Sequence, residues 1–350
     1  MKRVLAAVLC ASSLLFVAKP AAADDTLTIL GGAIALPLSA VLQTVAEKEG
    51  FFKAEHLNVV EQLVNSPSAA AALVATGKGD ICSLSAEAVM QGYEKGLKLE
   101  YFFNIAPRLT NVLAVLDSSP IKTLGDFKGK NIGVINIGSA GEVTAQMILL
   151  GAGIKGTDVT WSPIGVGPQA LDAVASHRVD AVGYPYPEVV PLELAGNLHM
   201  RVWRHPTLQS VSAAGFAATP DAIVAKADAL KRFSRAVAMA AVFVHYNRVA
   251  AARIFLQAGN AKFTEADVQR KAESFRLLAD DIPYIDPRTG KIGGLPLGEM
   301  KLFAQALYDM GSTKTVVPIG AIATNAYIDY ANDFDKKPII ELAKKAGDGT

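Results

Sequence analysis

Residues 131–143 combine an apolar run with a glycine- and serine-rich turn that could hold a charged group. The run 132–137 is typical of a strand, small residues then break it, and a helical pattern follows. Backbone N–H groups at the start of a helix attract anions and polar ligand heads. We therefore predict that Ser139, Ala140 and Gly141 bind a ligand, with plain capping of the helix as the alternative. A bulky side chain at Gly141 should then fill the site and leave stability nearly unchanged.

Three catalytic motifs are similar to this turn, but each lacks a residue that its chemistry needs. A phosphate-binding loop would require a lysine before Ser139. A nucleophile elbow would require glycine where Ile137 stands, and a dinucleotide-binding turn would require a third glycine. The turn therefore favours the binding of a ligand over phosphate or acyl-transfer chemistry.

The histidines and cysteines also give no reactive set. None of the five histidines has a metal-ligand spacing such as H-x-x-x-H. Cys82 lies in an apolar run, where a free thiol is usually a small core residue. We expect no catalytic residue, no metal and no cofactor.

The start of the chain is typical of an export signal. Lys2 and Arg3 precede the apolar stretch 4–18, and three alanines that end at Ala23 form a small-residue cleavage site. The apolar stretch is shorter than the ~20 residues that span a membrane. We expect residues 1–23 to be a signal peptide, cleaved after Ala23, so that the mature protein lies in the periplasm.

Composition excludes some classes of partner. The chain has 34 basic and 33 acidic residues, and three of the basic ones fall within the signal peptide, which leaves a mature charge of about −2. Nucleic-acid binding would need a clustered basic excess, which is absent. Cys82 is the single cysteine after residue 23, so no internal disulfide forms. The mature length suits two lobes.

Strand and helix signals alternate in two successive units. Strands are expected at 26–30, 57–64 and 81–84 in the first unit, and at 132–137, 159–164 and 181–184 in the second. The segments "LVATGKGDICSLS" and "DAVASHRVDAVGY" occupy equivalent places, each with a helix end, an Asp turn and a buried strand. Two such βαβαβ units predict two parallel sheets. The later part of the chain is expected to be helical, with helices at 225–257, 264–278 and 297–309 and from 336 onward.

Ligands of parallel sheets bind at the carboxyl ends of the strands. The loops there are 31–37, 65–68 and 83–87 in one unit, and 137–142, 164–168 and 184–188 in the other. They supply hydroxyl groups, two tyrosines, few charges and several apolar side chains. The balance predicts a small organic ligand with one polar or anionic end, rather than a bare inorganic ion. The predicted ligand-binding residues are Ile34, Leu36, Pro37, Ser66, Ser85, Arg108, Ser139, Ala140, Gly141, Tyr184, Tyr186 and Glu188.

Alternatives remain open for several of these residues. Ser66, Ser85 and Ser139 are each explained equally well as helix caps. One of Tyr184 and Tyr186 is expected to be structural, because alternate strand residues point to opposite faces. Arg108 could pair with an anionic ligand in bidentate fashion or form a surface ion pair. Glu188 could instead attract an amine.

Four segments carry a resemblance to a known family. They are "AEKEGFFKAEHLNV" (46–59), "ATGKGDICSLSAEAV" (75–89), "IKTLGDFKGKNIGVINIGS" (121–139) and "ASHRVDAVGYPYPEV" (175–189). The chain resembles exported solute-binding proteins of ATP-driven importers. It is similar to the branch that binds alkanesulfonates, taurine, nitrate and thiamine-pyrimidine precursors.

The resemblance implies an α/β fold of the type II periplasmic binding protein. Two doubly wound α/β lobes would be joined by two crossing strands, expected near 111–116 and 211–218, with the ligand cleft between the lobes. Lobe I would combine 24–111 with 217–350, and lobe II would be 112–216. Hinge closure of a monomer on its ligand would then present it to a membrane permease and its ATPase.

An enzyme of thiamine-pyrimidine-synthase type on the same fold is the alternative. The cysteine- or histidine-bearing motifs of those relatives are absent from this sequence. Where many relatives have a Trp–Glu–Pro element, this chain has "YPYPE" at 184–188. The identity of the ligand therefore does not follow from the resemblance.

Overall fold

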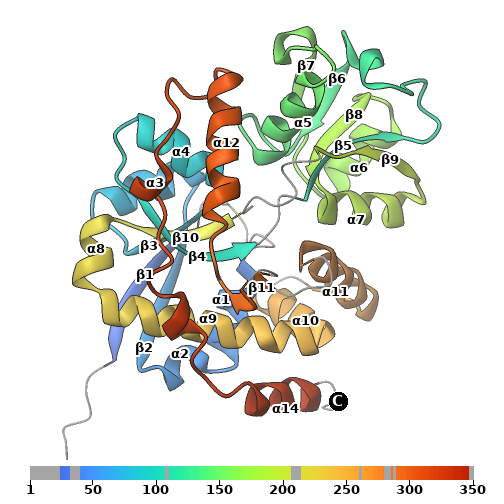
Figure 1. Cartoon of the computed structure of the whole chain (residues 1–350). Helices are drawn as coiled ribbons and strands as arrows, with labels where there is room; N and C mark the ends of the chain where they lie inside the picture. The colour runs from blue at the N-terminus through green and yellow to red at the C-terminus, as the bar shows by residue number, and fades with distance from the viewer. Residues whose placement is uncertain are drawn as a thin grey trace, which may run out of the picture.

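A computed structural model describes residues 24–31, 40–106, 110–205, 214–259, 262–279, 285–286 and 289–346. The expected signal peptide, residues 1–23, lies outside this part of the chain. The described residues form two α/β lobes, each built on a five-stranded mixed sheet (Figure 1). No helix of the described residues is both long and apolar enough to cross a membrane.

The sheet of the first lobe has the strand order β2-β1-β3-β10-β4. Strands β1, β2 and β3 are parallel, whereas β10 runs antiparallel to both β3 and β4. Buried or partly buried residues alternate with exposed ones from Leu57 to Gln62 of β2, which is an edge strand. The bounds are β1 Asp25–Gly31, β2 Leu57–Leu63, β3 Ile81–Leu84, β4 Glu100–Ala106 and β10 Ala214–Ala218.

The sheet of the second lobe repeats this plan with the order β7-β6-β8-β5-β9. Strands β6, β7 and β8 are parallel, and β5 runs antiparallel to β8 and β9. The bounds are β5 Asn111–Leu116, β6 Asn131–Val134, β7 Thr160–Pro163, β8 Ala181–Pro185 and β9 Met200–Trp203. The expected α/β class and the two-lobe arrangement are confirmed.

The internal repeat is visible in hydrogen bonds as well as in topology. The Asp80 carboxylate accepts the Thr28 N–H at 2.8 Å, and the Asp80 N–H donates to the Thr28 carbonyl at 2.9 Å. In the second lobe, the Asp180 carboxylate accepts the Asn131 N–H at 2.8 Å, and the Asp180 N–H donates to the Asn131 carbonyl. The two Asp turns that the sequence predicted as equivalent therefore fix the start of β3 and of β8 in the same way.

Helices cover the faces of both sheets. Those packed around the first sheet and its extensions are α1 Val41–Lys48, α2 Phe51–Ala54, α3 Pro67–Ala75, α4 Ala86–Glu94, α8 Pro220–Ala225, α9 Ala227–Tyr246, α10 Arg248–Ala258, α11 Glu265–Ala279, α12 Leu297–Asp309, α13 Ile328–Ala331 and α14 Lys337–Lys345. The second sheet carries α5 Ala140–Leu150, α6 Pro168–Ala175 and α7 Tyr186–Gly196. A short hairpin, β11 Ile285–Asp286 with β12 Lys291–Ile292, forms a separate two-stranded sheet beside β4, since the Asn104 N–H donates to the Gly293 carbonyl at 2.8 Å.

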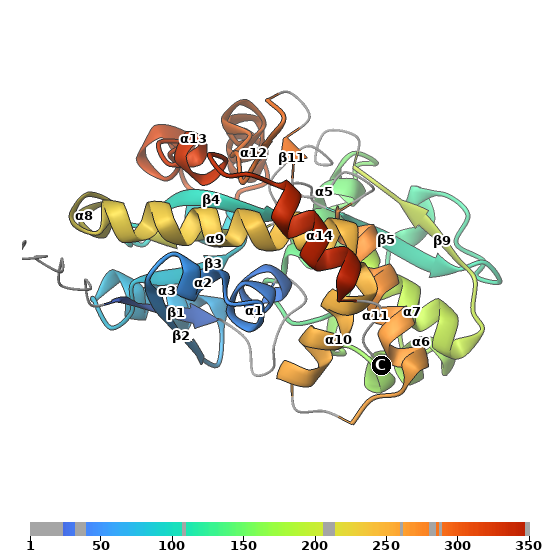
Figure 2. The same cartoon turned by 90° about the horizontal axis from the view of Figure 1, so that it is seen from below.

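The long helix expected at 225–257 is two helices, because the chain breaks at Asn247. The Asn247 side chain accepts the Ala250 N–H at 2.9 Å and so caps α10. Along α9, small and aromatic residues form a buried stripe that includes Phe233, Ala240 and Phe243. The Phe233 ring stacks on Phe52 with 5.4 Å between ring centroids, so α9 is the central element of the first lobe's core (Figure 2).

The chain changes lobe twice. Sheet membership changes between Ala106 of β4 and Asn111 of β5, and again between Trp203 of β9 and Ala214 of β10. Strands β5 and β10, which were expected to be the crossings, each belong wholly to one sheet. The connections therefore lie just before them, within 107–110 and 204–213.

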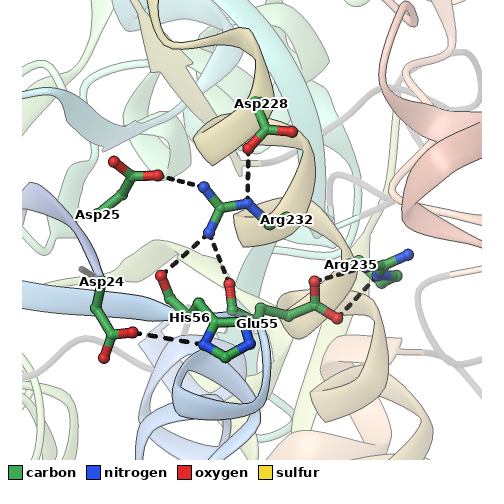
Figure 3. Close-up of polar contacts among 7 residues, drawn as sticks. All are labelled: Asp24, Asp25, Glu55, His56, Asp228, Arg232 and Arg235. Atoms are coloured by element: carbon green, nitrogen blue, oxygen red, sulfur yellow. Dashed lines mark hydrogen bonds and ion pairs between the residues drawn. The ribbon is translucent and has the colours of Figure 1, made fainter. Parts of the chain in front are cut away.

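A polar cluster ties the start of β1 to α9 (Figure 3). The Arg232 guanidinium donates to the side chains of Asp25 and Asp228 and to the Glu55 carbonyl. One turn later, Arg235 donates twice to the Glu55 carboxylate, at 2.8 and 2.7 Å. Glu55 is buried at 6% exposure, so the pair compensates a charge that would otherwise be costly to bury.

Helix α5 approaches β8 through two glycines. A Cβ on Gly141 would lie 2.2 Å from the Gly183 carbonyl oxygen. Gly141 is therefore required for the packing of helix on sheet. The expectation that a bulky residue here would leave stability nearly unchanged is wrong, because the position faces backbone rather than open space.

Replacing Arg235 by Ala should leave the Glu55 carboxylate buried without its bidentate partner. We expect a loss of about 2–3 kcal/mol in the free energy of unfolding, measured by urea denaturation. Arg178→Ala is the control, because its pair with Asp172 is exposed on both sides and should be worth less than about 1 kcal/mol. Equal losses in the two variants would contradict a structural role for the buried pair.

Replacing Gly141 by Ala should push α5 away from β8 and lower stability by about 1–3 kcal/mol. Gly298→Ala in α12 is the matched control, because nothing lies within 4 Å of its added Cβ. That control should be neutral or stabilising, since alanine favours a helix more than glycine. A Gly141→Ala protein that melts at the wild-type temperature would contradict the close approach.

Candidate ligand site at the facing sheet edges

Two connections join the lobes, and each links the edge at which the parallel strands of one sheet end to the corresponding edge of the other sheet. At the edge of the first sheet, Ala214 of β10 pairs with Ala106 of β4, beside the end of β3. At the edge of the second sheet, Asn111 of β5 pairs with Pro185 at the end of β8. Both connections therefore run from one carboxyl edge to the other. Five residue steps from Ala106 to Asn111 span at most about 17 Å, which keeps the edges close at this side.

The residues at the carboxyl edge of the second sheet are apolar at one end of the edge and include a cation at the other. Ile137 follows β6 and Val166 follows β7, and their side chains are 59% and 47% exposed. Tyr186 follows β8 in the middle of the sheet. Arg204 follows β9, next to the second crossing. The side farthest from the crossings is thus apolar, and the side beside them carries a cation.

Arg204 is the functional candidate that the sequence prediction missed. Its guanidinium carbon lies 4.5 Å from the centroid of the Tyr186 ring. Within the part of the chain that the structure describes, no carboxylate pairs with it, whereas the guanidinium of Arg201, three residues earlier, lies 3.8 Å from the Asp117 carboxylate. A guanidinium whose face rests on a ring keeps its N–H edge free for a planar anion.

His205 adds a second polar group beside Arg204. Its Nδ1 is buried and has no hydrogen-bond partner among the described residues. Burial lowers the pKa of the His205 imidazole, which favours its neutral form. A neutral imidazole can donate from one nitrogen and accept at the other. If the sequence analysis had predicted strand β9, it would have included Arg204 and His205 among the candidate residues, because they directly follow the end of that strand.

The turn at the start of α5 is occupied by its own side chains. The Ser139 hydroxyl accepts the Glu142 N–H at 3.4 Å, so it acts as a weak cap. The Glu142 carboxylate accepts the Gly138 N–H at 2.7 Å and the Gln146 amide at 3.0 Å. Gly138 adopts a positive φ of 80°, which favours glycine there. A carboxylate therefore already lies at this helix N-terminus, in the place that an anionic ligand was expected to take.

The remaining serines differ from one another. The Ser66 hydroxyl accepts the Ala69 N–H at 3.2 Å and caps α3. Capping was the alternative to ligand binding at this residue. Ser85 precedes α4 but makes no capping bond. Its hydroxyl is instead 2.6 Å from the Glu87 carboxyl group. Burial raises the pKa of that Glu87 carboxyl, although the Ser85 hydrogen bond opposes the shift.

The two tyrosines divide into one core residue and one edge residue. Tyr184 is fully buried in the second lobe, and its hydroxyl donates to the Gly165 carbonyl. Its ring is therefore part of the core instead of an aromatic wall. Tyr186 is half-buried and carries Arg204 on its face. The expectation that one of the two is structural fits this division.

Four predicted residues fall where the structure gives no description. Ile34, Leu36, Pro37 and Arg108 lie outside the described residues. Ala140 is the first residue of α5, and its contact with a ligand stays a prediction. Glu188 in the first turn of α7 is partly buried, which raises the pKa of its carboxyl, and the positive charge of Lys271 opposes the shift.

Other groups in the described chain do not form a reactive or metal-binding set. Cys82 is fully buried, and burial raises the pKa of its thiol to about 12, so the thiolate nucleophile does not form at neutral pH. Among the described residues, no three His, Cys, Asp or Glu side chains gather as metal ligands. A hollow of about 100 Å³ lies beside Leu116, His177 and Asp180. It is at the opposite edge of the sheet and is smaller than ordinary ligand pockets.

The chain matches one protein family and is similar to several solved structures. The profile of the family described as "NMT1/THI5 like" matches residues 41–251, more than half of the chain. No curated protein matches the chain. A solved structure from Bordetella bronchiseptica RB50 is similar, with 22% identity and a TM-score of 0.69, over 88% of this chain and 97% of that one.

Two alkanesulfonate-binding proteins share the fold. SsuA of Xanthomonas axonopodis pv. citri, solved with bound MOPS, is 16% identical with a TM-score of 0.66, over 87% of this chain and 99% of that one. The periplasmic aliphatic sulphonate-binding protein SsuA of Escherichia coli gives the same identity, score and coverage. These likenesses show the periplasmic binding protein fold. With the profile match, they mean that this chain belongs to the NMT1/THI5-like family.

Proposed function

We propose that this protein is an exported substrate-binding protein that captures a small organic solute and delivers it to an ABC importer. The observation that carries the proposal is Arg204. It is a cation without a carboxylate partner in the described chain, held on the Tyr186 ring at the edge where the two lobes join. Such a residue, next to a hinge, suits a ligand that both lobes enclose.

The charge of the site favours a ligand with one anionic end. A guanidinium binds carboxylate and sulfonate groups through parallel N–H donors. The helix N-terminus at Ser139 is less suited to that role, because the Glu142 carboxylate already accepts the Gly138 N–H. We therefore assign the anionic end to Arg204, with Ser139 and Ala140 as a second wall, whereas Gly141 faces the backbone of β8.

The rest of the ligand is expected to be organic. Ile137 and Val166 expose apolar surface on the loops after β6 and β7. Closure of the lobes would bury this surface against the ligand, which adds affinity in proportion to the apolar area removed from water. Sulfonates, carboxylates and pyrimidine-like compounds all have this combination. The ligands named for SsuA, alkanesulfonates and MOPS, support the same class for this chain.

Location and partners follow from the same proposal. Residues 1–23 would direct export and be removed after Ala23, leaving a mature protein in the periplasm. Its partners would be the small molecule, a membrane permease and the ATPase of the importer. The protein is proposed to be a monomer that closes around one ligand, with no nucleic-acid partner.

An enzyme of thiamine-pyrimidine-synthase type is the second candidate, because the family name includes THI5. Against it stands the chemistry of the described edges, where Arg204, Tyr186 and His205 offer binding groups and Cys82 is buried away from them. Binding without turnover is therefore the better-supported function.

Titration calorimetry with aliphatic and aromatic sulfonates, carboxylates and pyrimidines tests the proposal. We expect one site per chain for at least one compound, and recovery of that compound unchanged by mass spectrometry. Two independent sites, or a product formed from the bound compound, would contradict a binding protein.

Arg204→Gln should weaken binding of the anionic compound about 10- to 100-fold, because a charge-assisted hydrogen bond is worth about 1.5–3 kcal/mol. The melting temperature should stay near that of the wild type, since Arg204 is exposed. Arg178→Gln, at the other end of the second lobe, should leave affinity unchanged. Equal affinity in the Arg204→Gln and wild-type proteins would remove Arg204 from the site.

A further inference from the structure

Ser85 occupies the N-cap position of α4 without capping the helix. It directly follows β3 and has the extended backbone conformation of an N-cap, yet its side chain accepts no N–H from α4. Its hydroxyl instead lies 2.6 Å from Oε1 of Glu87. The serine therefore pairs with a carboxyl group in the first turn rather than with the backbone of the helix that it precedes.

The Ser85 turn lies beside the second crossing. Leu84, the last residue of β3, pairs with Gly215 in β10. Strand β10 starts one residue earlier, at Ala214, where the connection that begins at Arg204 ends. Ser85 is partly buried, so part of its surface is open to solvent. Ser85 of the first lobe and Arg204 of the second lobe thus lie beside the two ends of one connection.

The Glu87 carboxyl group is buried without a cation. Glu87 is 3% exposed, and no Lys, Arg or His of the described chain forms an ion pair with it. An isolated carboxylate is costly to bury, whereas a neutral carboxylic acid with a hydrogen-bond partner is not. Burial raises the pKa of Glu87, and the hydrogen bonds from Ser85 and from its own backbone oppose the shift.

The strands beneath Glu87 bring uncharged titratable groups. The Tyr101 hydroxyl of β4 donates to the Leu84 carbonyl at 2.7 Å, so its hydrogen is not available to Glu87. Burial raises the pKa of both Tyr101 and Cys82, which keeps them neutral. Helix α3 has no ionisable side chain. The ionisable residues of α12, which packs against α4, are Glu299, Lys301, Tyr308 and Asp309.

We propose that Glu87 is a neutral positioning residue that makes the Ser85 hydroxyl a hydrogen-bond donor to the anionic group of the ligand. The inference rests on the proposed function. The O–H of protonated Glu87 donates to Ser85 Oγ, and the Ser85 hydrogen is then free for a ligand oxygen. An ionised Glu87 would take that hydrogen itself and would compete with a ligand anion. Protonation of Glu87 therefore makes the first lobe select sulfonate or carboxylate oxygens over ammonium groups.

Titration calorimetry of the mature protein at increasing pH, with hexanesulfonate and benzenesulfonate, measures the effect of this proton. Both probes stay ionised throughout. Wild-type affinity should be highest while Glu87 is protonated and should fall about ten-fold as the pH rises through its raised pKa, because one hydrogen bond to a charged group is lost. Ser85→Ala should weaken binding by a similar factor at low pH and should also remove the fall.

Glu87→Gln isolates the contribution of the Glu87 proton. The amide keeps an N–H donor towards Ser85 at every pH, so this variant should not show the fall. It retains His205, whose protonation would also favour an anion, and the difference between the two proteins therefore belongs to Glu87. Glu47→Gln, at an exposed position of α1, is the control and should keep both the affinity and the pH dependence of the wild type.

Infrared spectroscopy tests the state of Glu87 without any ligand. The difference spectrum of wild type minus Glu87→Gln should contain the carbonyl stretch of a protonated carboxyl group, which should disappear over the pH range in which affinity falls. Absence of this band, or a fall in affinity that persists in Glu87→Gln, would overturn the inference. If the band is present but no sulfonate binds the wild type, the proposed anionic solute is wrong and the neutral state of Glu87 stands.

Discussion

The direction of the parallel strands is the constraint on which the whole arrangement depends. In each lobe, three parallel strands end at the same edge of the sheet, where ligands of such sheets bind. The antiparallel strands β5 and β10 start at those same edges, since Asn111 pairs with Pro185 and Ala214 pairs with Ala106. Two connections therefore join the two sets of strand ends, and groups that follow the parallel strands lie at the edges that these connections link.

Charge at these edges is largely compensated within the chain. Glu142 binds the Gly138 N–H at the start of α5, and Glu87 is hydrogen-bonded to Ser85 at the start of α4. Carboxylates in the first turn complement the helix dipole and stabilise the helix itself. A ligand anion would have to compete with them. Arg204 has no such internal partner in the described chain, so its position beside the crossing becomes the distinguishing feature of the site.

The sequence predicted those parts of the fold that have strong periodic signals. The strand at Ile81–Leu84 and the helix at Leu297–Asp309 have the expected bounds, because each is a clear apolar pattern between turn residues. Strand β9 was not expected. It is an edge strand in which each residue is only partly buried, so it lacks the alternation that marks a strand. Arg204 was overlooked for the same reason.

Side-chain partners were harder to predict than elements. The burial of Tyr184 depends on the Gly165 carbonyl, which lies on a loop 19 residues away. Gly141 was read as a ligand-facing position, but its role depends on the backbone of β8. Both are tertiary contacts, and hydrophobic periodicity carries no information about them. The predicted residues within 32–39 and at 108 lie beyond the described part of the chain.

A crystal structure of the mature protein with a sulfonate or carboxylate ligand would show directly whether Arg204 binds the anionic group. We expect one ligand between the two sheet edges, with its anionic group bonded to the Arg204 guanidinium and its apolar part near Ile137 and Val166. A ligand bound at the opposite edge of the second sheet, beside His177 and Asp180, would contradict it. So would an anionic group held by Ser139 alone, with Arg204 directed to solvent.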